Sequence, residues 1–189
     1  MTTLASTLTI RSFPRTATWL CDLFLLFTGV IFVAALAQVK IPLPFTPVPL
    51  TGQTFAVLLV GATLGSKRGA ASMTLYTALG VLGMPFFAGG ASGMAYLSGP
   101  TLGYLIGFVV AAYLVGKLAE RGLERNLRTS LIPFIVGTLI IYLFGAGWLA
   151  ILFGADKALA LGVLPFLIGD VIKMILAALA LPFAWKFVR

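Results

Sequence analysis

The feature that most constrains this chain is a series of six apolar stretches joined by short connections. They lie at residues 17–37, 52–64, 70–84, 101–118, 131–153 and 159–188. Of the 189 residues, 60% are hydrophobic and 10% are charged, whereas soluble domains carry roughly 45–50% apolar and about 25% charged residues. A soluble fold of this size cannot hide so much apolar surface, but lipid solvates it. The chain therefore predicts an all-α membrane protein, a six-transmembrane-helix bundle.

We expect one transmembrane domain over residues 1–189, with residues 1–16 as a polar, cytoplasmic N-terminal segment. The first apolar stretch has some features of a secretory signal, because Arg11 and Arg15 precede it and it ends in Ala35-Leu36-Ala37. Its length is close to that of a full span and exceeds the ~7–15 apolar residues of a signal core. We therefore expect an uncleaved helix. The second and third stretches are short for a span.

The basic residues predict the orientation of the bundle. With the N-terminus inside, ten of the thirteen Lys and Arg residues fall on the inner side, Lys40 and Lys157 fall outside, and Lys173 lies within a span. An excess of this kind follows the positive-inside rule and predicts cytoplasmic termini and a cytoplasmic loop at residues 117–130. The net charge of +8 does not predict nucleic-acid binding, since no basic stripe is interleaved with aromatic residues.

Several kinds of chemistry are excluded by residue type. The chain has no histidine and one cysteine, Cys21, so a Ser–His or Cys–His nucleophile is impossible and a metal cluster is not expected. No phosphate-binding loop of the Walker type occurs. We therefore expect no enzyme and no cofactor. The acids at positions 22, 120, 124 and 156 lie near span ends or in loops and are interpreted as solvated charges.

Two outer loops are apolar, which is unusual for loops that face water. Residues 40–50 carry four prolines and are expected to be extended, since proline fixes φ and donates no backbone hydrogen bond. Residues 85–93 combine Phe86 and Phe87 with three glycines. Irregular backbone near a membrane is tolerated where it is buried in protein or lines a cavity. Both loops are candidate walls or lids of an outward-facing pocket.

Small residues recur at helical spacing in two places. Gly61 and Gly65 form one strip, and Gly103, Gly107 and Ala111 form another. Such strips let membrane helices approach closely. We expect them to pack inside the bundle, with contact to another subunit as the alternative.

Asp170 and Lys173 are the strongest candidates for a binding site. They lie in the last apolar stretch, where each charge costs ~2.5–3.5 kcal/mol at the centre of a bilayer. The i, i+3 spacing places them on one helical face. A structural ion pair that locks the bundle is the alternative, but a charge within the membrane is by default a functional-site hypothesis.

A second candidate is the start of the fourth apolar stretch, SGPTLGY at residues 98–104. Proline presets φ at a helix start, and the free N–H groups there favour an anion such as a ligand carboxylate. Tyr104 adds an aromatic face with a polar tip. Helix capping by Thr101 is an equally good explanation of this motif.

Four motifs together resemble the BioY-type biotin transporters, the substrate-binding S components of energy-coupling factor (ECF) systems. The motifs are IPLPFTPVPL at residues 41–50 with QTF at 53–55, FAGG at 87–90, GPT at 99–101 with GYL at 103–105 and GF at 107–108, and GDVIK at 169–173. Where some family members carry asparagine after the paired glycines, this chain has Ala91-Ser92.

The resemblance implies six helices, an outward-facing pocket for biotin, and a place in the cell inner (cytoplasmic) membrane in contact with lipid. It also implies three partner subunits, an ECF transmembrane T component and two ATPases. The expected ligand-binding residues are Asp170, Lys173, Tyr104, Thr101, Gly90, Phe45 and Gln53. A carboxylate–ammonium pair complements a ureido group, with Asp170 accepting from N–H and Lys173 donating to C=O. The reverse assignment, Lys173 to the carboxylate of biotin, stays open.

Other functions fit the composition less well. An S component for another vitamin is the nearest alternative. A channel needs a continuous polar path, and only one apolar stretch here carries buried charge. A membrane enzyme and a structural scaffold are the remaining non-transport alternatives.

Overall fold

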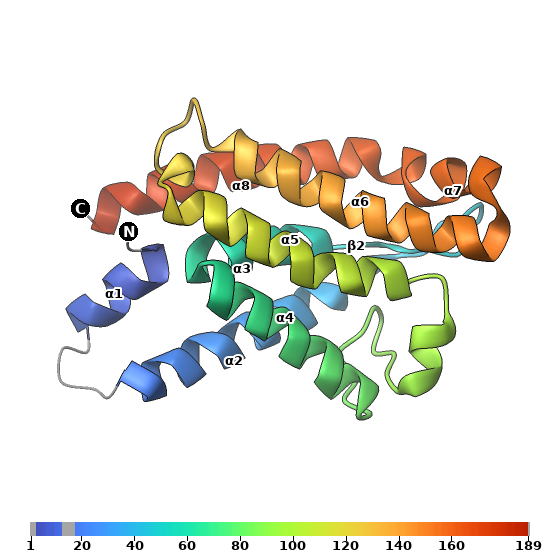
Figure 1. The fold of residues 1–189 in the computed structure, drawn as a ribbon, viewed down its shortest axis with the longest axis horizontal. Coiled ribbons are helices and arrows are strands. Elements are labelled where there is room, and N and C mark those ends of the chain that lie inside the picture. Colours follow the sequence, from blue (N-terminus) through green and yellow to red (C-terminus); the bar gives the residue numbers. More distant parts are fainter. Residues whose placement is uncertain (1–2, 13–17, 189) are drawn as a thin grey trace.

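The computed structural model describes residues 3–12 and 18–188, and most of them lie in helices that run along one long axis (Figure 1). The α-helices are α1 Leu4–Ser12, α2 Thr18–Ala37, α3 Gln53–Leu64, α4 Ser66–Val81, α5 Leu102–Glu120, α6 Leu131–Phe153, α7 Ala155–Gly162 and α8 Leu167–Val188. Short 3-10 helices lie in the connections, at η1 Met94–Ser98, η2 Leu123–Arg125 and η3 Leu164–Phe166. Two short strands, β1 Lys40–Ile41 and β2 Leu50–Thr51, pair antiparallel and close the loop between α2 and α3.

Four helical segments of the described chain are long and apolar enough to cross a membrane. They are Thr18–Ala37, Leu102–Glu120, Leu131–Phe153 and Ala155–Phe187. The 12-residue helix α3 is apolar but shorter, about 18 Å at 1.5 Å per residue. This architecture is that of a multi-pass membrane protein.

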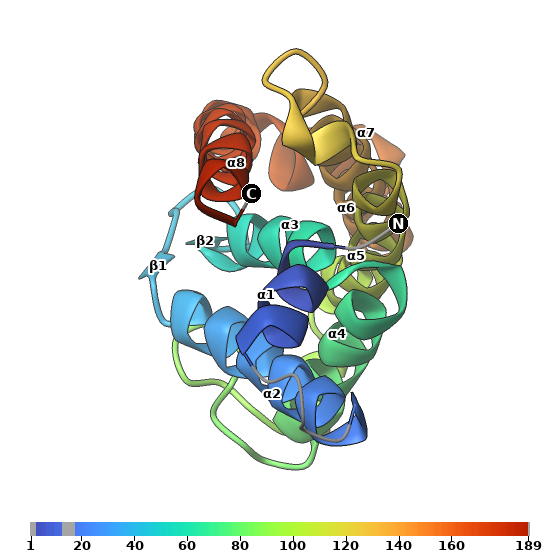
Figure 2. The ribbon, with the colours of Figure 1, turned by 90° about the vertical axis from the view of Figure 1, so that its left-hand side faces the viewer.

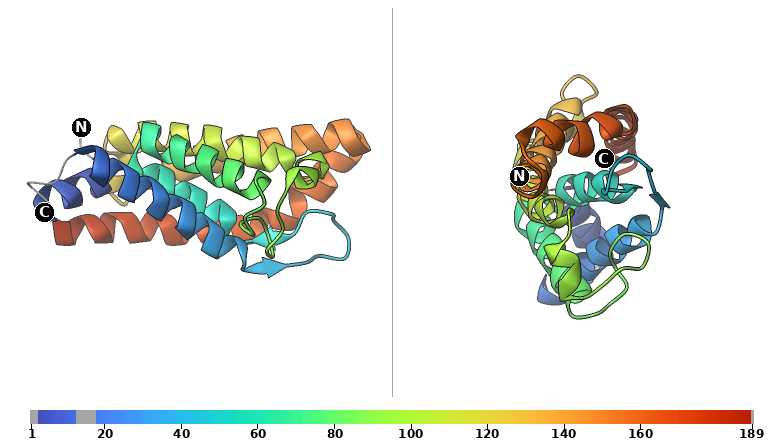
Figure 3. Two further views of the ribbon diagram at one scale, coloured as in Figure 1. Left: turned by 90° about the horizontal axis from the view of Figure 1, so that it is seen from below. Right: turned by 90° about the vertical axis from the view of Figure 1, so that its right-hand side faces the viewer.

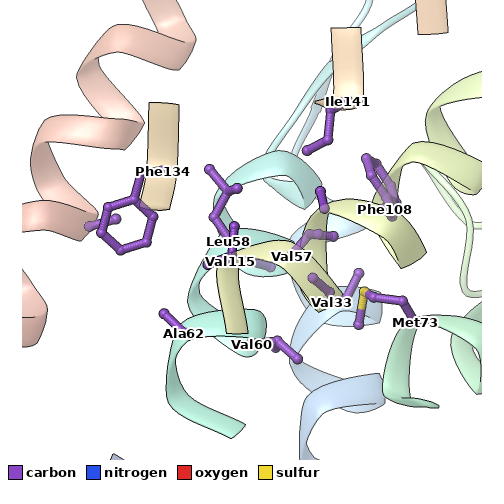
Figure 4. Close-up of a cluster of buried hydrophobic side chains, with 14 of the residues drawn as sticks. Val33, Val57, Leu58, Val60, Ala62, Met73, Phe108, Val115, Phe134 and Ile141 are labelled. Carbon is purple, nitrogen blue, oxygen red and sulfur yellow. The ribbon is translucent and has the colours of Figure 1, made fainter. Parts of the chain in front are cut away.

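The core lies between α3 and its neighbours. Helix α3 packs against α2, α4, α5 and α8, and Figure 2 shows it near the centre of the bundle when viewed along the helices. Helix α5 packs along α3, α4 and α6. Val57 and Leu58 of α3, Met73 of α4, and Phe108 and Val115 of α5 are buried in one cluster (Figure 4).

Glycines bring these helices into backbone contact. A Cβ on Gly61 of α3 would lie 2.7 Å from the carbonyl oxygen of Ala112 on α5. A Cβ on Gly103 of α5 would collide with the carbonyl oxygen of Phe144 on α6. Both strips of small residues therefore pack within the chain, which confirms the expected internal packing.

The join between α3 and α4 is shorter than predicted. Gly65, with φ of +88°, connects them alone, and a left-handed φ is accessible to glycine without a Cβ penalty. Helix α4 therefore begins at Ser66 rather than at position 70. Lys67 and Arg68 lie in its first turn, where Arg68 pairs with Asp22 at 2.6 Å.

The sixth apolar stretch is not one helix, so its predicted continuity over residues 159–188 is wrong. Helix α7 ends at Gly162, and Pro165 lies in the 3-10 turn η3 before α8 begins. Proline cannot donate a backbone hydrogen bond and breaks the regular helical ladder. Asp170 consequently lies in the first turn of α8.

The interpretation of Glu124 as a solvated charge is also wrong. The residue is 0% exposed, and its Oε1 accepts a hydrogen bond from Trp185 Nε1 at 3.1 Å.

The two ends of the bundle differ in character. Helix α1, η2 and the last turns of α8 lie at one end, which we name the terminal end. The β1–β2 loop, the loop before η1, and α7 lie at the other, the loop end (Figure 3). Of the predicted N-terminal polar segment, residues 4–12 form a helix, while Arg15 falls outside the described residues.

Candidate ligand-binding site

A pocket lies at the loop end, between the first turns of α3, α5 and α8 and the two apolar loops. Its lining residues are Val48, Pro49, Leu50, Thr51, Gln53, Thr54, Ala88, Tyr96, Thr101, Tyr104, Leu105, Phe108, Tyr142, Phe166, Asp170 and Lys173. About 510 Å³ of space lies between these atoms, including the part that opens to solvent, but only about 40 Å³ admits the centre of a water-sized sphere. The pocket is therefore narrow and mostly apolar, with a few polar groups.

The Asp170–Lys173 pair forms the polar wall of this pocket. The two side chains join at 2.8 Å, and Asp170 is 4% exposed. Lys173 Nζ also donates to the carbonyl oxygen of Thr51 at 2.8 Å and to Thr54 Oγ1 at 3.0 Å. Thr54 Oγ1 donates to Asp170 Oδ1 at 3.1 Å, and the Tyr142 hydroxyl donates to Oδ2 at 2.5 Å. Both charges are thus held by neighbours from β2, α3 and α6.

Asp170 and Lys173 differ in how many further hydrogen bonds each can form. An ammonium has three donors, and Lys173 directs them to Thr51, Thr54 and Asp170. A carboxylate has about four acceptor positions, and the described residues supply Asp170 with three donors. Asp170 can therefore accept one more N–H without losing a contact, while Lys173 must exchange one to reach a ligand oxygen.

Tyr104 contributes its ring rather than its hydroxyl. The hydroxyl donates to the carbonyl oxygen of Gly162 at 2.6 Å and so holds the end of α7. The ring fits against α6 because Gly145 has no Cβ there. Thr101 is the N-cap residue of α5, but its side chain makes no capping hydrogen bond.

Gln53 connects the two loops through a buried chain of hydrogen bonds. Its Oε1 accepts from Thr51 Oγ1 at 3.0 Å, and its Nε2 donates to the Tyr76 hydroxyl at 2.7 Å. That hydroxyl in turn donates to the carbonyl oxygen of Phe86 at 2.9 Å. Phe87 stacks on Tyr96 with ring centroids 4.6 Å apart, which fixes the second loop against the pocket wall.

The β1–β2 loop is tied to the far side of the pocket. Thr46 Oγ1 donates to the carbonyl oxygen of Leu161 at 2.6 Å, next to the Gly162 carbonyl that holds Tyr104. The end of α7 therefore anchors one loop and one pocket wall together.

Comparison with known proteins identifies the family. The sequence model of the BioY family matches residues 6–189. The chain belongs to the BioY family. It is 45% identical to a probable biotin transporter BioY of Pyrococcus horikoshii, over 80% of this chain and 87% of that one. It is 36% identical to a biotin transporter BioY of Rhizobium etli, over 82% of this chain and 86% of that one.

A solved structure also resembles this BioY-family chain. It is the crystal structure of the S-component for biotin from an ECF-type ABC transporter. The TM-score is 0.77 at 27% identity, and the alignment covers 89% of this chain and 93% of that one.

The structure brings most of the predicted site residues of this BioY-family member together. Asp170, Lys173, Tyr104, Thr101 and Gln53 line the pocket. Phe45 and Gly90 do not: the Phe45 side chain is 62% exposed at the tip of its loop, and Gly90 lies at an exposed turn with φ of +78°.

Two groups that hold the charged pair, Tyr142 and Thr54, were not predicted from the sequence. Tyr142 is 28 residues from Asp170, and Thr54 is 116 residues from it. Neither residue stands out in its own helix, since a Tyr and a Thr are ordinary there. Only the packing of α3 and α6 against α8 brings them to the carboxylate.

Proposed function

We propose that this chain binds biotin at the pocket of the loop end and serves its uptake as the substrate-binding S component of an ECF-type transporter. The observation that carries the proposal is the buried Asp170–Lys173 pair in an otherwise apolar pocket of a BioY-family chain. The names of its relatives as biotin transporters support the same ligand.

The polar end of biotin matches the pair. A ureido group offers two N–H donors and one carbonyl acceptor. Asp170 has one acceptor position left and takes a ureido N–H there. Lys173 exchanges its contact with Thr54, the longest of its three, for the ureido oxygen. Charged hydrogen-bond partners in a mostly apolar pocket make this the strong end of the complex.

The remaining parts of biotin find apolar and helix-start surroundings. The bicycle and tail contact the rings of Tyr104 and Phe108. The carboxylate lies toward the start of α5, near Thr101, where free N–H groups favour an anion. In the reverse orientation Lys173 takes the carboxylate instead, and the binding experiment below distinguishes the two.

In this proposal, the protein lies in the inner membrane of the cell, with six crossing helices: α2, α3, α4, α5, α6 and α8. The terminal end faces the cytoplasm. Ten of thirteen basic residues belong to that end or to the chain termini. Strong external labelling of a cysteine placed at position 125 in intact cells would reverse this orientation. The partners in this proposal are a transmembrane T component and two ATPases, and the ATPases supply the energy for release.

The decisive experiment is calorimetric titration of the purified chain in detergent with a panel of ligands. Biotin should bind, and thiamin and riboflavin should not. Biotin methyl ester keeps the ureido group and removes the carboxylate charge. Its binding should fall only modestly if Asp170 and Lys173 hold the ureido group, and strongly if Lys173 holds the carboxylate. Binding of thiamin or riboflavin with no binding of biotin would assign the chain to another vitamin, and binding of none of them by folded protein would refute the proposal.

A further inference from the structure

A second cavity lies at the terminal end, on the outer face of α8. It is a groove of about 510 Å³ on the measure of space open to the centre of a water-sized sphere. Its lining residues are Leu127, Leu176, Leu179, Ala180, Pro182, Phe183 and Lys186. It is separate from the pocket of the loop end: the two cavities share no lining residue, and the groove begins at Leu176, six residues or about 1.7 helical turns beyond Asp170 on α8.

The groove is apolar along its length. Leu176, Leu179 and Phe183 are spaced i, i+3 and i+7 on α8, so they form one stripe. Their exposed fractions are 54%, 54% and 59%. Leu127, from the connection between α5 and α6, forms the opposite wall and is 57% exposed. The shape suits a hydrocarbon chain that lies along the helix.

A basic pocket of about 350 Å³ adjoins this groove at the C-terminal end of α8. It is lined by Arg125, Asn126, Leu127, Pro182, Trp185 and Lys186, and it shares three of these residues with the groove. Within the described part of the chain, Lys186 forms no ion pair. The Arg125 guanidinium lies over the Trp185 ring, 4.3 Å from its centroid. Two cations thus meet at the point where the apolar stripe ends.

The one acid at this place is withdrawn from the pocket. Glu124 is fully buried, and its Oε1 faces Trp185 Nε1 at 3.1 Å and Arg125 Nε at 3.5 Å. Burial raises the pKa of the Glu124 carboxyl. The exposed Arg121 and Arg128 add positive charge at the same end.

We propose that the groove and the basic pocket together bind one anionic phospholipid, with an acyl chain along Leu176, Leu179 and Phe183 and the phosphate between Lys186 and Arg125. A cavity that is apolar over most of its length and cationic at one end complements an amphiphile with a negative head group. Basic pockets between membrane helices on the cytoplasmic side hold such head groups, and the cytoplasmic leaflet supplies them. A soluble phosphate compound leaves the apolar stripe unused, so the lipid is the fitting occupant.

Native mass spectrometry of the full chain in detergent tests this site. The probes are phosphatidylglycerol and phosphatidylcholine with identical palmitoyl and oleoyl chains, plus inorganic phosphate as competitor. Wild type should bind phosphatidylglycerol in preference to phosphatidylcholine, and phosphate should not displace it. Lys186→Gln should weaken phosphatidylglycerol binding about fivefold, the effect of one basic residue near an anionic head group. Lys186→Arg should retain it.

Two further variants separate this site from general attraction and from misfolding. Lys157→Gln makes the same charge change on exposed α7 at the loop end and should leave lipid binding unchanged. Ala180→Phe keeps every charge but fills the groove, and should weaken phosphatidylglycerol binding as much as Lys186→Gln does. Biotin titration of each variant reports whether the fold is intact, independently of lipid.

Equal binding of the two lipids by wild type, or equal losses in Lys157→Gln and Lys186→Gln, would overturn the proposal. If Lys186→Gln does not fold, the result is taken from Ala180→Phe, and unchanged phosphatidylglycerol binding in that variant overturns it as well.

Discussion

At the scale of single residues, Asp170 is the side chain on which the proposed function depends most directly. Asp170→Asn replaces a charged acceptor by a neutral one and can present an N–H to a ligand N–H. Hydrogen bonds to charged groups are worth ~1.5–3 kcal/mol, so we expect biotin affinity to fall about tenfold to over a hundredfold in a folded protein. Calorimetric titration of monodisperse protein measures this.

A matched control comes from the same end of the molecule. Asp156→Asn makes the same chemical change on the exposed start of α7 and should bind biotin as wild type does. Lys173→Met should weaken binding about as much as Asp170→Asn. The double variant should lose less than the sum of the two, because both residues act on one ligand group and on each other. Near wild-type affinity in folded Asp170→Asn would remove this residue from the site.

Glu124 predicts how stability depends on pH. Burial raises the pKa of this carboxyl in the folded protein above the ordinary value of 4.5. Its contribution to stability is then fully present below pH 4.5 and is lost as pH rises through the raised pKa. Glu124→Gln keeps an acceptor for Trp185 but does not titrate. The difference in melting temperature between the variant and wild type should therefore increase in favour of the variant from pH 4 to pH 8. A difference that stays constant over this range would show that ionisation of the Glu124 carboxyl does not affect stability.

Residue-scale features differ in how far sequence could predict them. The Asp170–Lys173 contact followed from i, i+3 spacing on one helix, which needs no knowledge of the fold. Tyr142 and Thr54 reach the same carboxylate from two other helices. Such contacts depend on helix rotation and depth, which the hydrophobic pattern of a lipid-exposed helix does not define.

At the scale of helices, the close contact of α5 and α6 depends on glycine. A Cβ on Gly103 collides with the backbone of α6, and one on Gly107 lies 3.1 Å from Ile141 Cα, where a shift of a few tenths of an ångström relieves it. Gly103→Ala should therefore lower the melting temperature most and Gly107→Ala less, since forcing extra atoms into packed helices costs about 1–3 kcal/mol. Gly147→Ala on α6, with open space around its Cβ, should not destabilise the protein.

Thermal unfolding of the three variants in one detergent provides this comparison. An equal decrease in melting temperature for Gly147→Ala and Gly103→Ala would show that the stability depends on the backbone conformation of glycine and not on the contact between α5 and α6.

Helix boundaries were predictable where apolar runs end in charged or polar residues, and less so elsewhere. Helix α6 begins at Leu131 and ends at Phe153, the same limits as the predicted apolar stretch at residues 131–153. The break between α7 and α8 was missed because residues 159–188 stay apolar across Pro165. Hydropathy measures transfer into lipid and does not register the loss of one backbone donor. The break moves the charged pair to a helix start, next to the pocket opening.

At the scale of the whole molecule, the composition alone indicated a membrane bundle, and the four membrane-capable segments and the similarity to a solved S-component structure agree with that class of fold. The apolar character of the two loops also predicted their place at the pocket, and Val48, Pro49 and Ala88 do line it. The hydrogen bond that connects the β1–β2 loop to α7 could not be predicted, because it joins residues far apart in the chain. This bond, between Thr46 and Leu161, spans 115 residues.

This arrangement predicts that biotin binding and loop protection are coupled. Only about 40 Å³ of the pocket admits the centre of a water-sized sphere, which is too little for a bicyclic ligand unless a wall moves. The bundle helices are packed through backbone contacts and resist displacement, whereas the β1–β2 loop is held by the Thr46–Leu161 hydrogen bond, the Lys173 contact with the Thr51 carbonyl and a two-residue ladder. The loops are therefore the parts that open, and contacts with bound ligand should hold them closed.

Hydrogen exchange with and without biotin should show slower exchange at residues 40–50 and 85–93, and little change in α6. Thr46→Val, which removes the bond to α7 and keeps the side-chain shape, should speed exchange of residues 40–50 in the absence of biotin. Unchanged protection of both loops on biotin binding would assign entry to a different path.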